Sequence, residues 1–258
     1  HMSSNVKCKI NSHPYHFLIS LTRNNTTRML RKTYLALEHR YKARGGNAAN
    51  SSVVASQLGV TSSLLCSLSS SHSDESNLTF ALNDLKSYGV HVSTHCPRHF
   101  GCSLPVSHVV ISRKNQSRTI IHHRALPELS CSDFEKMITR IPETTNAFHF
   151  EGRAVEVTKR MIEVARRHVD KNRWKTTISL EIEKPKRRGL LRALRHVDIV
   201  FLSQDFVREC DFGSSASEGI QNVSKYIRDQ FEDYVRTVRA RSARISIISL
   251  RDFFCENT

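Results

Sequence analysis

Three short stretches of the chain carry side chains that could bind a polar ligand. The first, "RGGNAAN" at residues 44–50, contains Gly46, Asn47 and Asn50. Glycine lets a ligand approach the backbone closely, and amides one helical turn apart can both donate and accept hydrogen bonds. That chemistry suits a neutral polyhydroxy ligand such as a sugar better than a bare phosphate. The same residues could equally form an ordinary tight turn with an asparagine cap.

The other two stretches place carboxylates after apolar runs. "FEGRA" contains Glu151, and "LEIEKP" contains Glu181 and Glu183. Carboxylates in such positions can orient sugar hydroxyls or hold Mg²⁺ through water. They can equally form ion pairs with the neighbouring Arg153 and Lys184, and the sequence alone leaves both interpretations open.

The second half of the chain alternates between strand and helix patterns. Strands are predicted at 146–151, 176–182 and 197–203, and helices at 154–171, at 185–196 and from 215 toward 240. In the first of these helices the predicted apolar face consists of Val157, Met161, Val164 and Ala165. This order predicts parallel βαβ units with helices on both faces of a sheet. In such sheets ligands bind at the carboxyl ends of the strands, where the three stretches lie.

The first half of the chain is less regular. Helices are predicted over 48–58 and 74–88, and extended segments at "VTSSLLCSL" and "VHVST". The runs "HVVISR" and "RTIIHHR", separated by "KNQS", predict a β-hairpin. His122 and His123 point to opposite faces of its second strand, so we expect one to be packed and the other solvated.

Composition and charge bound the class of protein. The chain has 258 residues, 39% apolar and 24% charged, which is typical of a globular protein, and its net charge is +15. The basic residues gather at 23–44, 184–195 and 236–251. A net positive charge favours polyanions, but the aromatic residues of a nucleic-acid stacking platform are not interleaved with these groups. We therefore favour solvated basic faces over a nucleic-acid interface.

The cysteines and the apolar runs suggest a compartment. Seven cysteines, an odd number spread along the chain, favour reduced thiols over a disulfide framework. The apolar runs are too short for a membrane span, so we expect a cytoplasmic protein. The stretch "THCPRHFGC" offers zinc-ligand residue types in His95, Cys96, His99 and Cys102. Because their spacing matches no usual finger pattern, we favour a loop and predict no metal site there.

Five stretches together resemble consecutive blocks of one enzyme family. They are "RGGNAANSSVVASQLG", "NQSRTIIHHRALPELSCSDFEK", "FHFEGRAVEVTKRM", "ISLEIEKP" and "VDIVFLSQDFV". In this order and spacing they resemble ketohexokinases (fructokinases), which are ribokinase-like (PfkB) carbohydrate kinases. The resemblance covers 43–230 and is flanked by a divergent basic segment at 1–42 and a divergent tail at 231–258, where the family has part of its ATP site.

The resemblance implies a fold and an activity. The fold would be a three-layer α/β/α sandwich with a small β-sheet lid around 89–124, which forms a β-clasp homodimer. The activity would be ATP- and Mg²⁺-dependent phosphorylation of fructose to fructose 1-phosphate. By position, Gly46, Asn47 and Asn50 match the sugar contacts, and Arg118 matches an arginine that reaches ATP phosphate, where a guanidinium can bind bidentately.

The chain also departs from the family pattern. No two of its nine glycines are spaced as Gly-x-Gly, so the family's Gly-Ala-Gly-Asp motif, which supplies the catalytic base and an anion site, is absent from these 258 residues. Gln204 replaces the lysine of the family's Ser-Lys-Asp block, and 1–42 contains no aspartate to hold sugar hydroxyls. We therefore assign no catalytic residue and expect impaired catalysis.

Two other functions remain open at this point. The chain could be a non-catalytic protein that binds sugar or dimerises with a partner. It could also be a basic nucleic-acid-binding protein built on a kinase fold. Saturable fructose binding without turnover would favour the first, and a steep salt dependence of nucleic-acid binding would favour the second.

Overall fold

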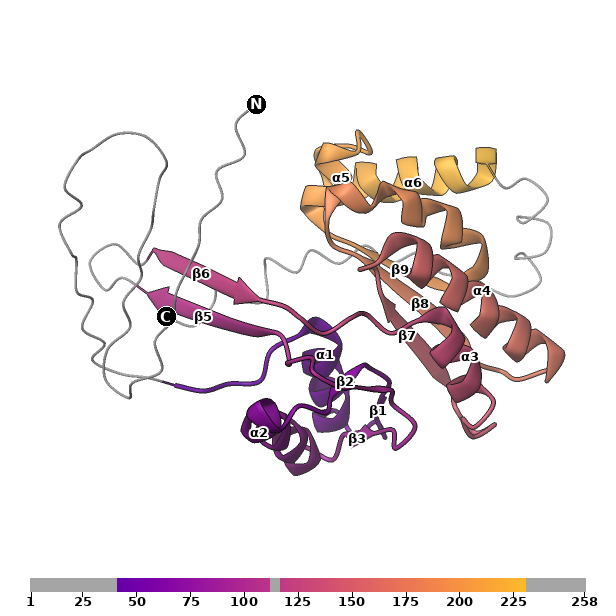
Figure 1. The fold of residues 1–258 in the computed structure, drawn as a ribbon. Coiled ribbons are helices and arrows are strands. Elements are labelled where there is room, and N and C mark those ends of the chain that lie inside the picture. Colours follow the sequence, from indigo (N-terminus) through magenta and orange to yellow (C-terminus); the bar gives the residue numbers. More distant parts are fainter. Residues whose placement is uncertain (1–40, 112–116, 231–258) are drawn as a thin grey trace, which may run out of the picture. The chain divides into compact units, whose positions relative to one another are not determined.

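The structure is a computed structural model that describes residues 41–111 and 117–230 (Figure 1). The chain divides into two units, His1–Ala43 and Arg44–Thr258, and everything discussed below lies in the second. The predicted basic segment 1–42 and tail 231–258 fall almost wholly outside the described residues, so those boundaries stay predictions. Across the described ranges, no helix is both long and apolar enough to cross a membrane.

Helices and strands alternate along most of the described chain. The helices are α1 (Asn47–Gln57), α2 (Glu75–Ser87), α3 (Cys131–Ile138), α4 (Val155–Lys171), α5 (Gln204–Glu209) and α6 (Ala216–Gln230), with 3₁₀ helices η1 (His72–Asp74) and η2 (Pro185–His196). The strands are β1 (Ser63–Leu64), β2 (Leu68–Ser69), β3 (His91–Val92), β4 (Arg98–His99), β5 (Val106–Ile111), β6 (Arg118–His123), β7 (Ala147–Glu151), β8 (Thr177–Ile182) and β9 (Ile199–Leu202).

The predicted βαβ units are confirmed in a parallel sheet of order β7-β8-β9. Helix α4 connects β7 to β8, η2 connects β8 to β9, and both pack against the sheet (Figure 1). Apolar side chains alternate along the strands and meet across them, so that Phe148 lies opposite Ile178 and Leu180 opposite Val200. These four are buried and form the centre of the main hydrophobic core, which α3 and α4 help to close. Burial of this face is the main stabilising contribution to the unit.

Helix α4 turns a slightly different face to the core than the sequence predicts. Ile162 and Ala165 are fully buried, whereas the predicted Val157 and Met161 are only half-buried. The buried residues are Thr158, Ile162, Val164, Ala165 and Val169, so the predicted Val164 and Ala165 are confirmed. Because α4 packs against α3, η2 and the sheet, these contacts cover Thr158 and Ile162 rather than the neighbouring Val157 and Met161.

The segment 185–196 is a 3₁₀ helix with a kink rather than the predicted α-helix. It begins at Pro185, and Arg187 has the non-helical angles φ −97° and ψ 23°. Gly189 packs closely on α4, because a β-carbon there would lie 2.8 Å from Cγ1 of Val155. Close packing and the kink therefore override the helical pattern of this segment.

The cations of the basic stretch 184–195 lie on the solvent-facing side of this segment. Its apolar residues Leu190, Leu191, Ala193 and Leu194 are buried. Its exposed cations are Lys184, Lys186, Arg188, Arg192 and Arg195. The guanidinium of Arg188 lies 6.0 Å from the ring centroid of Phe212, within cation–π range. The basic stretch 184–195 is therefore an amphipathic segment with a solvated face, as the sequence favours.

The first half contains the predicted helices, but its extended segments form very short strands. Strands β1 and β3 pair in parallel, as do β2 and β4, with two residues in each strand. The predicted hairpin is confirmed as the antiparallel pair β5–β6. His122 and His123 are both exposed in the single chain. The expectation that one of them packs in the β-clasp concerns a dimer contact and stays a prediction. His122 hydrogen-bonds Ser107 and His123 hydrogen-bonds Ser103.

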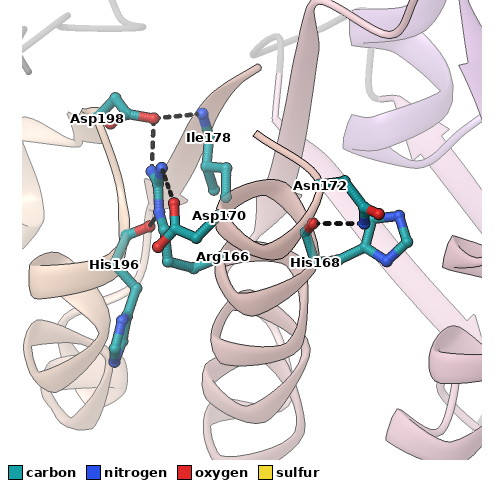
Figure 2. A network of polar contacts seen from close by, with 7 residues as sticks. All are labelled: Arg166, His168, Asp170, Asn172, Ile178, His196 and Asp198. Carbon is teal, nitrogen blue, oxygen red and sulfur yellow. Dashed lines mark hydrogen bonds and ion pairs between the residues drawn. The ribbon is translucent and has the colours of Figure 1, made fainter. Parts of the chain in front are cut away.

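A polar network at the amino ends of β8 and β9 joins α4 to the sheet (Figure 2). Arg166 Nη2 donates to Asp198 Oδ2 at 2.6 Å, and Arg166 Nε donates to the carbonyl of His196 at 3.0 Å. The same Asp198 oxygen accepts the backbone N–H of Ile178 at 2.7 Å. The side chains of Arg166 and Asp198 are 12% and 21% exposed. Removal of the cation would therefore leave a largely buried carboxylate unpaired.

We expect Arg166→Met to lower the free energy of unfolding by about 2 kcal/mol, the usual cost of breaking one side of a partly buried pair. Arg167→Met is the matched control, because Arg167 lies next to it on α4 and is exposed. Urea denaturation at neutral pH measures both. Equal stability of the two variants would show that the network contributes nothing to the fold.

Candidate functional site

The start of α1 presents two amides to solvent. Gly46 precedes the helix with φ 94° and ψ 128°, a conformation that glycine adopts without strain. The Asn50 N–H donates to the Gly46 carbonyl at 3.0 Å, which forms the first helical turn. Asn47 and Asn50 are both exposed. Asn47 lies close enough to Glu181 at the end of β8 to lower the pKa of that carboxyl, so the first and third predicted stretches meet in space.

Arg44, which sequence reasoning assigned to a solvated basic stretch, holds the second amide. Its Nε donates to Oδ1 of Asn50 at 3.3 Å, and its guanidinium pairs with Asp84 and lies 5.5 Å from the ring centroid of Tyr88. With Oδ1 of Asn50 engaged, the NH₂ group of that amide is the part that can donate to a ligand. The signal in the sequence is only an arginine directly before two glycines, which is too weak to find this role.

Gly152 brings the ends of β7 and β8 together. Its N–H donates to the Glu181 carbonyl at 2.9 Å, and Glu151 lies opposite Glu181 in the strand register. A β-carbon at Gly152 would lie 2.4 Å from that carbonyl oxygen and 2.5 Å from Cδ1 of Leu190. Only glycine allows this approach, and its role was missed in the sequence because the contact is made by residues distant in the chain.

Glu151 and Glu181 form a carboxylate pair at this edge. The Glu151 side chain is 11% exposed, and its Oε1 is buried with no hydrogen-bond partner among the described residues. Burial, then the charge of Glu181, raises the pKa of Glu151 to about 7. Burial, then the charge of Glu183, raises the pKa of Glu181, against the charge of Arg187 and the interaction with Asn47. A hydroxyl donor or a cation would relieve both carboxylates.

The basic neighbours of these glutamates have defined partners. Lys184 Nζ lies 2.5 Å from Glu183 Oε1, so Glu183 forms the local ion pair that the sequence left open. Arg153 lies 3.1 Å from Glu128 and 4.0 Å from Glu151. Arg153 is therefore shared between two carboxylates, and neutralises Glu151 only in part.

The remaining predicted residues lie on other elements. Arg118 is exposed at the start of β6, opposite Ile111. Gln204 is the first residue of α5, just beyond the carboxyl end of β9 and so at the same edge of the sheet as Glu181. The structure thus brings Asn47, Glu151 and Glu181 together, with Arg118 on the hairpin.

The cysteine and histidine stretch at 95–102 forms other contacts. His95 Nδ1 lies 2.8 Å from Nη1 of Arg140, and the Cys102 carbonyl accepts a hydrogen bond from Ser69. Over 41–111 and 117–230, no three histidine, cysteine, aspartate or glutamate side chains are grouped so as to hold a metal ion directly.

Solved structures establish the fold class. The described fold is similar to Anopheles gambiae adenosine kinase, with a TM-score of 0.58 at 14% identity, covering 80% of this chain and 60% of that one. It is also similar to a PfkB protein from Polaromonas sp. JS666, with a TM-score of 0.55 at 13% identity over 73% and 65% of the two chains. Fructokinase from Xylella fastidiosa gives 0.52 at 15% identity over 79% and 64%. The chain therefore has the ribokinase-like α/β fold, as the resemblance implies.

One sequence relative indicates which kind of kinase the chain is related to. Mouse ketohexokinase is 34% identical over 173 residues, which are 66% of this chain and 55% of that protein. No protein-family model matches the chain. The chain is thus a homologue of ketohexokinase, and it spans about half the length of the curated relative it matches. The resemblance drawn from the five sequence stretches is confirmed.

Proposed function

We propose that this chain binds a ketose such as fructose at the amide–carboxylate site formed by Asn47, Asn50, Glu151 and Glu181. The observation that carries the proposal is the proximity of Asn47 to Glu181, close enough for the amide to lower the pKa of that carboxyl, at the place where the start of α1 meets the carboxyl edge of the sheet. Amides that donate and accept, beside carboxylates that accept, are suited to the hydroxyls of a sugar. The homology to ketohexokinase supports a sugar as the ligand class.

The carboxylates also fit Mg²⁺ held through water. Glu151 has a buried oxygen without a partner among the described residues, and Glu181 lies beside it in the register. Oxygen ligands and retained waters are what Mg²⁺ prefers, and the ion would supply positive charge near a transferred phosphate. We propose that Glu151 and Glu181 would hold it, whereas Glu183 is already paired with Lys184.

The residues that should bind ATP phosphates fit much less well. No Gly-x-Gly occurs in the 258 residues, and Gln204 offers no charge. We propose Arg118 as the phosphate contact, which the family resemblance implies. Because phosphoryl transfer depends on positioning and electrostatic stabilisation, we propose that this chain binds sugar but phosphorylates it very slowly.

A coupled assay for fructose 1-phosphate tests the proposed weak turnover. With ATP, Mg²⁺ and fructose in excess, we expect kcat at least about 1000-fold below that of mouse ketohexokinase measured alongside, since these 258 residues do not contain the motif that the resemblance implies for the general base and the anion site. Turnover within tenfold of the mouse enzyme would contradict this part of the proposal and leave the binding site standing.

We further propose that the chain forms a homodimer through the β5–β6 hairpin, in the cytoplasm. Val109, Ile111 and Ile120 are 50%, 64% and 52% exposed, and Val109 lies opposite Ile120, so they share one face. Exposed apolar clusters of this kind mark interaction surfaces. Light scattering should show a dimer that Ile120→Glu converts to a monomer, while Thr119→Glu on the other face does not. A monomeric parent chain would refute the proposal.

A further inference from the structure

Two cysteines in the first half of the unit contact each other. The Cys66 N–H donates to Sγ of Cys96 at 3.3 Å, the Cys96 Sγ lies 3.8 Å from the Leu64 carbonyl oxygen, and the two cysteine side chains are close enough to shift each other's pKa. Cys66 lies just before β2, and Cys96 lies in a turn closed by its own N–H and the carbonyl of Ser93 at 3.1 Å, just before β4. Because β2 and β4 pair in parallel, the fold keeps the two sulfurs adjacent although 30 residues separate them.

The environment gives the two thiols different roles: Cys96 is suited to attack an oxidant, and Cys66 is suited to resolve the product. The interaction with the Cys66 side chain, then the hydrogen bond from the Cys66 N–H and the charge of Arg98, lower the pKa of Cys96 against the effect of burial. The same side-chain interaction and burial raise the pKa of Cys66. Cys96 is therefore the thiol of the pair that ionises more readily to the nucleophilic thiolate, while Cys66 keeps its proton.

At two other cysteines, Cys131 and Cys210, burial outweighs the cations that lie near them. Burial, then the charge of Glu135, raises the pKa of Cys131, and burial raises the pKa of Cys210. Both should react slowly with oxidants, because the thiol is a poor nucleophile. They serve as internal references for the pair.

Access to the pair requires only local opening. Cys96 is 6% exposed and Cys66 is half-buried. The strands on either side contain two residues each, so few backbone hydrogen bonds must break before a small oxidant reaches the sulfur. Short, weakly paired segments are the part of a fold that opens most readily.

We propose that Cys66 and Cys96 form a reversible intrachain disulfide when the chain meets a peroxide. The Cys96 thiolate attacks one peroxide oxygen, so that an S–O bond forms, the O–O bond breaks and hydroxide leaves as water after taking a proton. The Cys66 sulfur then attacks the Cys96 sulfenic acid, so that the S–S bond forms, the S–O bond breaks and the Cys66 proton leaves with the hydroxyl as water. The two thiols lose two electrons and the peroxide gains them.

This site is independent of the proposed sugar site. The sequence predicts reduced thiols from the odd number and wide spacing of the cysteines, and that prediction concerns the resting state. The pair is a dithiol that becomes a disulfide under oxidant, which makes it a modification site rather than part of a permanent framework.

Mass spectrometry on the full chain tests the proposal. Reduced protein is treated with hydrogen peroxide at pH 7, blocked with N-ethylmaleimide and digested. We expect a peptide pair linked through Cys66 and Cys96, lighter by two hydrogens and released by dithiothreitol, while Cys131 and Cys210 are recovered alkylated. Recovery of Cys66 and Cys96 alkylated to the same extent as these two references would overturn the proposal.

Variants and rates complete the test. Cys66→Ser should abolish the linked peptide and leave Cys96 trapped by dimedone as sulfenic acid, whereas the control Cys131→Ser should keep the link. In the unmodified chain without peroxide, N-ethylmaleimide should react at Cys96 at least about tenfold faster than at Cys131 at pH 7. Equal rates would count against the proposal even if Cys66→Ser failed to fold.

Discussion

Gly152→Ala is expected to lower the free energy of unfolding by about 3 kcal/mol or more in urea denaturation. A β-carbon there would lie 2.4 Å from the Glu181 carbonyl oxygen and 2.5 Å from Leu190, a fully buried core residue. The carbonyl belongs to the central strand and cannot move without breaking the hydrogen bond from the Gly152 N–H. Overpacking of this kind costs about 1–3 kcal/mol, and a lost buried hydrogen bond adds to it.

Gly45→Ala is the matched control for this substitution. A β-carbon at Gly45 meets nothing within 4 Å, and Gly45 does not have the positive φ of Gly46. It should therefore change the free energy of unfolding by less than about 0.5 kcal/mol. If Gly152→Ala had the same free energy of unfolding as Gly45→Ala, then β7, β8 and η2 would not approach each other closely at this edge.

Glu151→Gln is expected to stabilise the fold at pH 8 by about 2 kcal/mol and to have little effect near pH 4. In the folded chain the pKa of Glu151 is raised from 4.5 to about 7, so the folded state holds a proton that the unfolded state releases. The parent chain therefore loses stability as the pH rises through this window, because ionisation of the buried carboxyl opposes folding. Glutamine has the same shape and does not ionise.

The free energy of unfolding at several pH values checks this prediction. Glu135→Gln is the control, since Glu135 is exposed on α3. A parent chain whose stability does not fall between pH 4 and 8 relative to Glu151→Gln would show that Glu151 is not held in a desolvated site. Millimolar Mg²⁺ should reduce the difference at pH 8, because a cation stabilises the ionised carboxylate.

The regular half of the fold could be predicted because its signals are local. Alternating strand and helix patterns from 146 onward gave parallel βαβ units, and their order placed Glu151 and Glu181 at one edge. The failures have physical causes. A kink at Arg187 and contact with α4 made 185–196 a 3₁₀ helix, and packing against α3, η2 and the sheet covers Ile162 of α4 rather than the predicted Met161.

The site could be predicted only in part, because several of its contacts join distant residues. Asn47 and Asn50 carried a local signal in their type and spacing. Gly152 carried none, since its close approach to Glu181 depends on how two strands pair. The sequence does not distinguish Arg44 from the other basic residues around it, although Arg44 hydrogen-bonds the Asn50 side chain. The sequence therefore indicates the chemistry of individual residues, but not which distant residues surround them in the fold.

Calorimetric titration of the chain with fructose tests the central claim most directly. We expect saturable binding to the parent chain without ATP, and at least about tenfold weaker binding to Asn47→Ala, since a lost hydrogen bond to a buried partner costs about 1.4 kcal/mol or more. Ser51→Ala, at an exposed position on the same helix, should bind as the parent does. Absence of saturable binding, or equal affinity of Asn47→Ala and Ser51→Ala, would contradict the assignment of this site to a sugar.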